Sequence, residues 1–170
     1  MQAKDAIQNL KAGNIRFVEG KVERSNQDSA RIQSLTEGQA PWAIILSCAD
    51  SRVVPELAFD TGLGELFVIR VAGNIANKST VASIEYAIAH LGTKLIVVMG
   101  HESCGAVGAA LANGGGSESL DHLLAEIKPA ISQSGSTDIN EVVKVNAQFS
   151  AKNLITRSSI ISDAVKNEGV

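Results

Sequence analysis

The sequence predicts an α/β fold, in which a small parallel β-sheet core is flanked by helices and preceded by a helical arm. Three short apolar runs bounded by turn residues lie at Ala43–Ser47, Leu66–Val71 and Leu95–Met99, and such runs are typical of strands buried on both faces of a parallel sheet. Between the second and third runs, Thr80–Leu91 has apolar residues at helical spacing, and Gly92 follows it as a stop signal. A strand, a crossover helix and a second parallel strand therefore follow one another.

Helical patterns surround this core. Residues 3–18 and 28–35 place apolar side chains at mostly helical spacing, which predicts the N-terminal arm. After the third run, we expect a small-residue helix ending at Ala112 and two longer helices at residues 120–131 and 139–165. A chain of 170 residues, 45% of them hydrophobic, is long enough for one packed core. We predict a single domain over residues 1–170, made of the arm (1–38), an α/β core (39–112) and a helical region (117–168).

Composition and charge exclude several classes of function. The formal net charge is −3 and the lysines and arginines form no run, so a phosphate backbone has no basic surface to bind and we expect no nucleic-acid partner. The apolar runs are far shorter than the roughly 20 residues that cross a bilayer, so we expect no membrane span. Residues 1–10 lack the pattern of a signal peptide, which favours a cytoplasmic location, although a leader that has been removed stays an alternative.

The candidate reactive residues follow two of the predicted strands. Cys48 comes directly after the first apolar run, and His101 and Cys104 come after the third. The carboxyl ends of parallel strands share one edge of a sheet, where ligands bind. Two thiols and one imidazole suit zinc and leave a fourth position open for water, which is typical of a catalytic site. The alternatives are an inert core cysteine or a thiol redox pair, although Cys48 and Cys104 are not in a Cys-x-x-Cys arrangement.

Four ordered motifs resemble the signature of one enzyme family. They are Cys48-x-Asp50-Ser51-Arg52, Arg70-Val71-Ala72-Gly73-Asn74, Ile84-Glu85-Tyr86-Ala87 and Gly100-His101-x-x-Cys104-Gly105. Together, they make the chain similar to the β-class carbonic anhydrases, in which zinc converts carbon dioxide to bicarbonate and back. Four motifs in the right order are much more specific than any one of them.

The resemblance implies a role for each residue near the metal. Cys48, His101 and Cys104 would bind Zn²⁺, and Arg52 would hold Asp50 so that this carboxylate accepts a hydrogen bond from a zinc-bound hydroxide. An ordinary surface ion pair is the alternative for Asp50 and Arg52. Asp50 could also move onto the metal as a fourth ligand and close the site. Relatives that use bicarbonate to lock that closed form have tryptophan three residues before the first cysteine, where this chain has Ile45, so we expect the open form.

The resemblance also implies a substrate pocket and an assembly. Gln39, Phe67, Ala72, Tyr86 and Gly105 match pocket positions of the family, which usually has valine where this chain has Ala72. In the family, the residues matching Gln39, Phe67 and Tyr86 approach the zinc of a neighbouring subunit, which implies a homodimer or a homotetramer embraced by the arm. Core packing is the alternative for Phe67 and Tyr86, and helix capping is the alternative for Gly105.

The expected function is zinc-dependent reversible hydration of carbon dioxide by a carbonic anhydrase, a zinc lyase. One alternative is hydrolysis of carbon disulfide or carbonyl sulfide at the same zinc site. A catalytically silent zinc-binding scaffold is another, because the family's C-terminal edge strands have no counterpart after Val170 and we expect them to be absent. The presence of Asp50 and Arg52 favours an enzyme, since a merely structural zinc site has no use for this pair.

Overall fold

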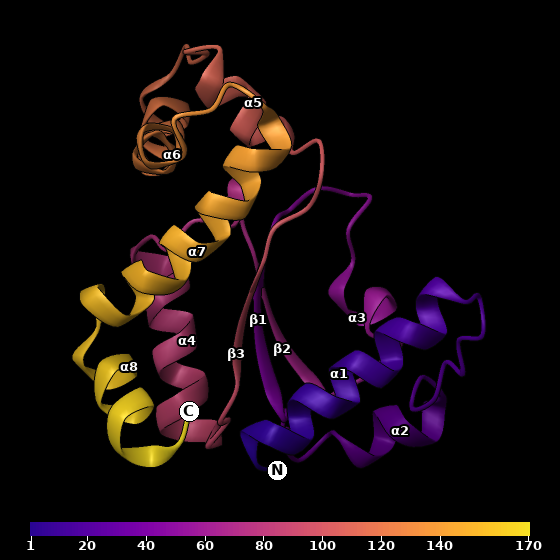
Figure 1. Ribbon diagram of the computed structural model, residues 1–170. Helices are drawn as coiled ribbons and strands as arrows, with labels where there is room; N and C mark the ends of the chain where they lie inside the picture. Colours follow the sequence, from indigo (N-terminus) through magenta and orange to yellow (C-terminus); the bar gives the residue numbers. More distant parts are fainter.

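The sheet at the centre of the molecule is parallel and has helices on both faces (Figure 1). The computed structural model describes residues 1–170, apart from the side chain of residue 168. Its strands are β1 (Ala43–Ser47), β2 (Leu66–Arg70) and β3 (Ile96–Met99), in the order β2-β1-β3. β1 pairs in parallel with both neighbours, so that Ile44 lies opposite Phe67 and Ile96. The predicted α/β fold is confirmed, with strand ends within one residue of those expected.

Alternate residues of β1 face two separate layers of helices. Ile44 and Leu46 pack against α4 (Lys78–Leu91), α7 (Ile139–Arg157) and α8 (Ser159–Asp163). Ala43 and Ile45 face the opposite way, toward α1 (Ala3–Val18). All five residues of β1 are therefore fully buried, which explains why this strand is a continuous apolar run rather than an alternating one.

Helix α1 lies on the sheet of its own chain. Ala6 and Leu10 are buried against the sheet, and Gly13 packs directly on the backbone of Phe59, next to α3 (Pro55–Ala58). The short helix α2 (Ser29–Ser34) follows α1, and the apolar side chains of Ile15, Phe17 and Val18 stay exposed. The helical arm that the sequence predicts thus docks through Ala6, Leu10 and Gly13 and leaves other apolar residues exposed.

Replacing Gly13 with alanine should destabilise the protein, although alanine normally favours a helix over glycine. A Cβ at this position would overlap the carbonyl oxygen of Phe59, which is backbone and cannot turn aside. We expect a loss of about 1–3 kcal/mol in the free energy of unfolding, measured by urea denaturation. In the control Gly108→Ala, the added methyl meets only the end of the Ile139 side chain, at 3.4 Å. Equal or greater stability of Gly13→Ala would contradict this docking of α1.

The crossover helix and the helices after β3 complete the fold. The turn η1 (Ala72–Asn74) leads into α4, whose Asn77 side chain caps the helix at the amide of Thr80 and whose last turn ends at Gly92 in the left-handed conformation. After β3 come α5 (Gly105–Leu111), α6 (Glu118–Ser134), α7, α8 and η2 (Ala164–Glu168). Within the described part of the chain, none of these helices has the length and apolar character to cross a membrane.

The prediction of one continuous helix over residues 139–165 is wrong, because the chain breaks at Ser158. This residue is extended, with φ −137° and ψ 121°. Its hydroxyl caps the start of α8 by accepting a hydrogen bond from the amide of Ile161, and it donates to Glu85 in α4 at 2.6 Å. A serine that caps a new helix and reaches a distant glutamate thus turns the chain back onto α4.

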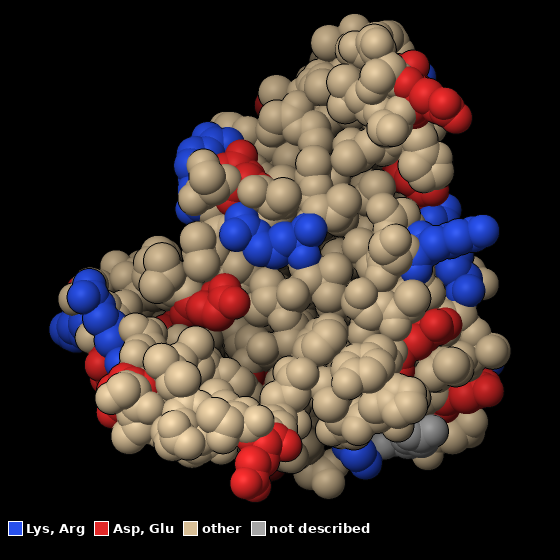
Figure 2. All heavy atoms as spheres, turned by 180° about the vertical axis from the view of Figure 1, so that it is seen from behind, with Lys and Arg blue, Asp and Glu red and all other residues tan. Residues whose placement is uncertain are grey.

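Charged side chains of both signs are dispersed over one face of the molecule. On the face seen in Figure 2, lysines and arginines alternate with aspartates and glutamates among uncharged residues. This face therefore presents no continuous basic area.

Candidate metal centre

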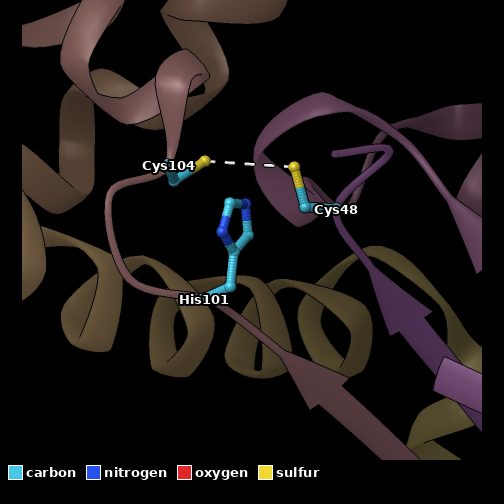
Figure 3. Close-up of side chains that lie close together, drawn as sticks. All are labelled: Cys48, His101 and Cys104. Carbon is cyan, nitrogen blue, oxygen red and sulfur yellow. Dashed lines mark hydrogen bonds between the residues drawn. The ribbon is translucent and has the colours of Figure 1, made fainter. Parts of the chain in front are cut away.

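The carboxyl ends of β1 and β3 bring two cysteines and a histidine together (Figure 3). The ligand atoms of Cys48, His101 and Cys104 all lie within 4.8 Å of one another, and the two sulfur atoms are 3.9 Å apart. Both cysteines are free thiols. Two sulfurs bound tetrahedrally to one zinc at ~2.3 Å would be ~3.8 Å apart. The spacing therefore fits a shared metal ion.

His101 presents an unpaired nitrogen to this cluster. Its Nδ1 donates to the carbonyl oxygen of Glu102 at 2.9 Å, which leaves the lone pair on Nε2. Nε2 is buried and has no hydrogen-bond partner among the described residues. A buried polar atom without a partner costs stability, and a metal ion would satisfy it. The donor set of two thiolates and one neutral imidazole fits zinc in particular.

Hydrogen bonds shift the pKa values of the two thiols in opposite directions. Donation from the Cys104 thiol lowers the pKa of Cys48 well below its ordinary value, and the backbone amide of Gly73, 3.4 Å from the Cys48 sulfur, acts in the same direction. The same hydrogen bond to Cys48, together with burial, raises the pKa of Cys104. The metal-free pair therefore holds one proton between two sulfurs, and a metal ion would displace that proton on binding.

Metal-free protein should contain one thiolate at neutral pH, detected by its ultraviolet absorbance. Because the pKa of Cys48 is lowered, its thiolate is present above that pKa and should disappear only as the pH falls through it, well below neutrality. Cys104→Ala removes the donor, so the pKa of Cys48 should rise and its absorbance should be lost at a higher pH. A titration unchanged by Cys104→Ala would show that the two thiols do not share a proton.

Asp50 and Arg52 form a two-pronged ion pair beside the ligand atoms. Arg52 donates from Nε to Asp50 Oδ1 at 2.9 Å and from Nη2 to Oδ2 at 2.8 Å, and these bonds hold the pKa of Asp50 far below its usual range. Asp50 Oδ2 lies 3.8 Å from His101 Nε2. Arg52 also donates to the carbonyl of Ser103 at 3.1 Å, so one guanidinium joins the two loops that carry the ligands.

Further side chains that support the site were not expected from the sequence. Arg70, at the end of β2, donates to the carbonyl oxygens of Cys48, Asp50 and Val53 at 3.0, 2.6 and 2.9 Å, and so fixes the loop after β1. Asn140, in α7, accepts from the amide of Ser103 at 2.8 Å. Arg70 could have been predicted because it is the first residue of the second motif, whereas no local sequence pattern predicts the role of Asn140.

The predicted pocket residues divide into two groups. Ala72 lies in η1, next to the glycine whose amide contacts Cys48, and Gly105 begins α5 directly after Cys104. Phe67 and Tyr86 lie together, with ring centroids 6.2 Å apart, but Phe67 pairs with Ile44, which is about 13 Å along the strand from Cys48. Gln39 is exposed before β1, beyond the opposite edge of the sheet. Gln39, Phe67 and Tyr86 are thus remote from the ligands of their own chain.

Comparison with known proteins identifies relatives of this chain. A family model described as carbonic anhydrase matches residues 43–170. Carbonic anhydrase 2 of Mycobacterium tuberculosis is 52% identical over 103 residues, which are 61% of this chain and 50% of that protein. A carbonic anhydrase of Helicobacter pylori is 41% identical over 105 residues, covering 57% and 46%. The chain thus spans about half the length of these relatives.

Solved structures with the same fold are also carbonic anhydrases. The β-carbonic anhydrase CafA of Aspergillus fumigatus superimposes with a TM-score of 0.73 at 30% identity, covering 81% of this chain and 71% of that one. A β-carbonic anhydrase from Sordaria macrospora, described as tetrameric, gives a TM-score of 0.71 at 28% identity, covering 97% and 88%. The family match includes the three strands and both ligand-bearing loops. On this evidence, the chain belongs to the β-class carbonic anhydrase family.

Proposed function

We propose that this protein binds one zinc ion through Cys48 Sγ, His101 Nε2 and Cys104 Sγ and catalyses the reversible hydration of carbon dioxide to bicarbonate. The observation that carries the proposal is the convergence of two free thiols and an unpartnered imidazole nitrogen within 4.8 Å, beside a carboxylate held by arginine. Membership of the carbonic anhydrase family supports the same reaction.

The chain's own residues can orient and activate the reactants. When bound, zinc makes a coordinated water molecule acidic enough to act as a nucleophile near neutral pH. Asp50, kept ionised by Arg52, can only accept a hydrogen bond, so it would hold the proton of that nucleophile and direct its lone pair toward carbon dioxide. Ala72, which precedes Gly73, and Gly105, which follows Cys104, have small or no side chains and would leave space for a small apolar substrate.

The open form of the site is the one that we propose to dominate. Asp50 is held by two side-chain nitrogens of Arg52, Nε and Nη2, and its main-chain carbonyl is held by Arg70. Moving the carboxylate onto the metal would break the two bonds to Arg52. Ile45, at the position that distinguishes the relatives locked by bicarbonate, is fully buried within the sheet core.

The proposed working unit is a homodimer or homotetramer. Gln39, Phe67 and Tyr86 lie away from the ligands of their own chain, and Tyr86 is 48% exposed, so a neighbouring chain is the one whose site they would complete. Light scattering should give a mass of at least twice 17.8 kDa. A fully active single chain would contradict this arrangement.

Zinc content and carbon dioxide hydration, measured on the same preparation, test the proposed function. We expect one zinc per chain and stopped-flow hydration activity that is lost on chelation and restored by added zinc. Carbonyl sulfide and carbon disulfide should be assayed in parallel, because hydrolysis of either without hydration of carbon dioxide would favour that alternative. Zinc without turnover of any of these substrates would identify a silent scaffold, and failure to bind zinc would overturn the metal site itself.

A further inference from the structure

Helix α7 contacts the loop that carries His101 and Cys104, and also the turn η1, whose Gly73 amide lies against the sulfur of Cys48. Near its start, Asn140 accepts from the amide of Ser103, in the loop between His101 and Cys104. Two turns later, the side chain of Asn146 donates from Nδ2 to the carbonyl oxygen of Gly73 at 2.8 Å. Figure 1 shows α7 crossing the molecule beside β3, from the end near α5 toward α8. One helix therefore contacts the backbone on each side of the site.

Gly73 connects Asn146 to the metal ligand Cys48. The carbonyl oxygen of Gly73 is held by Asn146, and its amide points at the Cys48 sulfur at 3.4 Å. Gly73 has φ 71°, a left-handed conformation that favours glycine, and a Cβ there would lie 2.7 Å from the end of Ile127. The turn is thus fixed by packing on one side and by the Asn146 amide on the other.

Burying the Asn146 side chain costs folding free energy, because one of its polar atoms is left without a partner in the described part of the chain. Its side chain is completely buried, and its Oδ1 has no hydrogen-bond partner among the described residues. The same holds for Nδ2 of the neighbouring Asn74, which is 2% exposed. An apolar side chain of similar size would avoid this cost. What the asparagine provides, and an apolar side chain would not, is the hydrogen bond to the carbonyl oxygen of Gly73.

We propose that Asn146 is a positioning residue for the metal centre, which holds the Gly73 amide on the sulfur of Cys48. This inference rests on the proposed zinc binding. An N–H that donates to a thiolate holds the sulfur in place for the metal and also draws some charge from it, and loss of partners of this kind lowers metal affinity by roughly 10–100-fold because the ligand is no longer oriented. When the hydrogen bond from Asn146 is lost, the turn η1 can move, and the Gly73 amide no longer stays on the Cys48 sulfur.

Substitution of cobalt for zinc makes this effect visible. We expect Asn146→Leu, which keeps the size of the side chain and removes its donor, to bind Co²⁺ about 10-fold more weakly in competition with a chelator. Its thiolate-to-cobalt charge-transfer band should move to longer wavelength, because the sulfur becomes a better electron donor. Leu154→Val is the matched control, since Leu154 is buried on the same helix and belongs to the core cluster of β1 and α4.

The outcomes separate this inference from the proposed function. An unchanged band and affinity in Asn146→Leu, with only its stability reduced as in Leu154→Val, would overturn the role of Asn146. Absence of Co²⁺ and Zn²⁺ binding by the unaltered protein would instead overturn the metal site. If Asn146→Leu does not fold, Asn146→Ser, whose shorter side chain cannot reach Gly73, replaces it with the same two expected changes.

Discussion

Replacing His101 with alanine should reduce zinc affinity by at least about 100-fold and bring carbon dioxide hydration down to the uncatalysed rate. The substitution removes the one nitrogen donor and leaves two buried sulfurs that hold a single proton between them without metal. Zinc per chain after dialysis, measured by elemental analysis, and stopped-flow hydration of the same sample are the two readouts.

The matched control for His101→Ala is His122→Ala, at an exposed histidine of α6. We expect His122→Ala to keep its full zinc content and activity, since it lies outside the cluster of ligand atoms. Retention of tightly bound zinc by His101→Ala would mean that the metal is bound by other residues.

Asp50→Asn should lower the turnover number by roughly 100–1000-fold while zinc stays bound. The amide keeps the size of the carboxylate but can donate, so it no longer enforces the orientation of the nucleophile's proton. It also weakens the two bonds from Arg52. Because both side chains are partly or mostly exposed, the free energy of unfolding should change little.

Steady-state kinetics with parallel zinc analysis distinguish a catalytic role of Asp50 from a role in binding the metal. Asp163→Asn, at an exposed carboxylate of α8, is the control and should behave like the unaltered protein. An unchanged turnover number in Asp50→Asn would reduce Asp50 and Arg52 to the surface ion pair considered as the alternative. Loss of zinc in this variant would indicate that Asp50 is a ligand.

The core of the fold and the candidate ligands were accessible from the sequence because local patterns encode them. β1 is buried on both faces, so its continuous apolar run, Ala43–Ser47, defines its ends. Cys48 and His101 follow strands that pair in parallel, and parallel strands must place their carboxyl ends together. The family was predicted from the same residues and is confirmed by the match over residues 43–170.

Contacts between distant residues were not accessible in the same way. The hydrogen bond from Asn146 to Gly73 spans 73 positions, and that from Ser158 to Glu85 also spans 73. The residue types asparagine and serine do not predict such distant partners. Apolar residues keep helical spacing on both sides of Ser158, so the sequence does not indicate the break between α7 and α8. The roles of Gln39 and Tyr86 stay predictions, because they depend on a second chain.

X-ray absorption at the zinc edge of the purified protein tests the metal site most directly, because it identifies the atoms around the ion. We expect two sulfur atoms at ~2.3 Å and two lighter atoms, nitrogen or oxygen, at ~2.0–2.1 Å. Replacing Cys48 with alanine should remove one of the sulfurs from any zinc that stays bound. A spectrum with no sulfur, or with a single sulfur, in the unaltered protein would contradict binding by Cys48, His101 and Cys104.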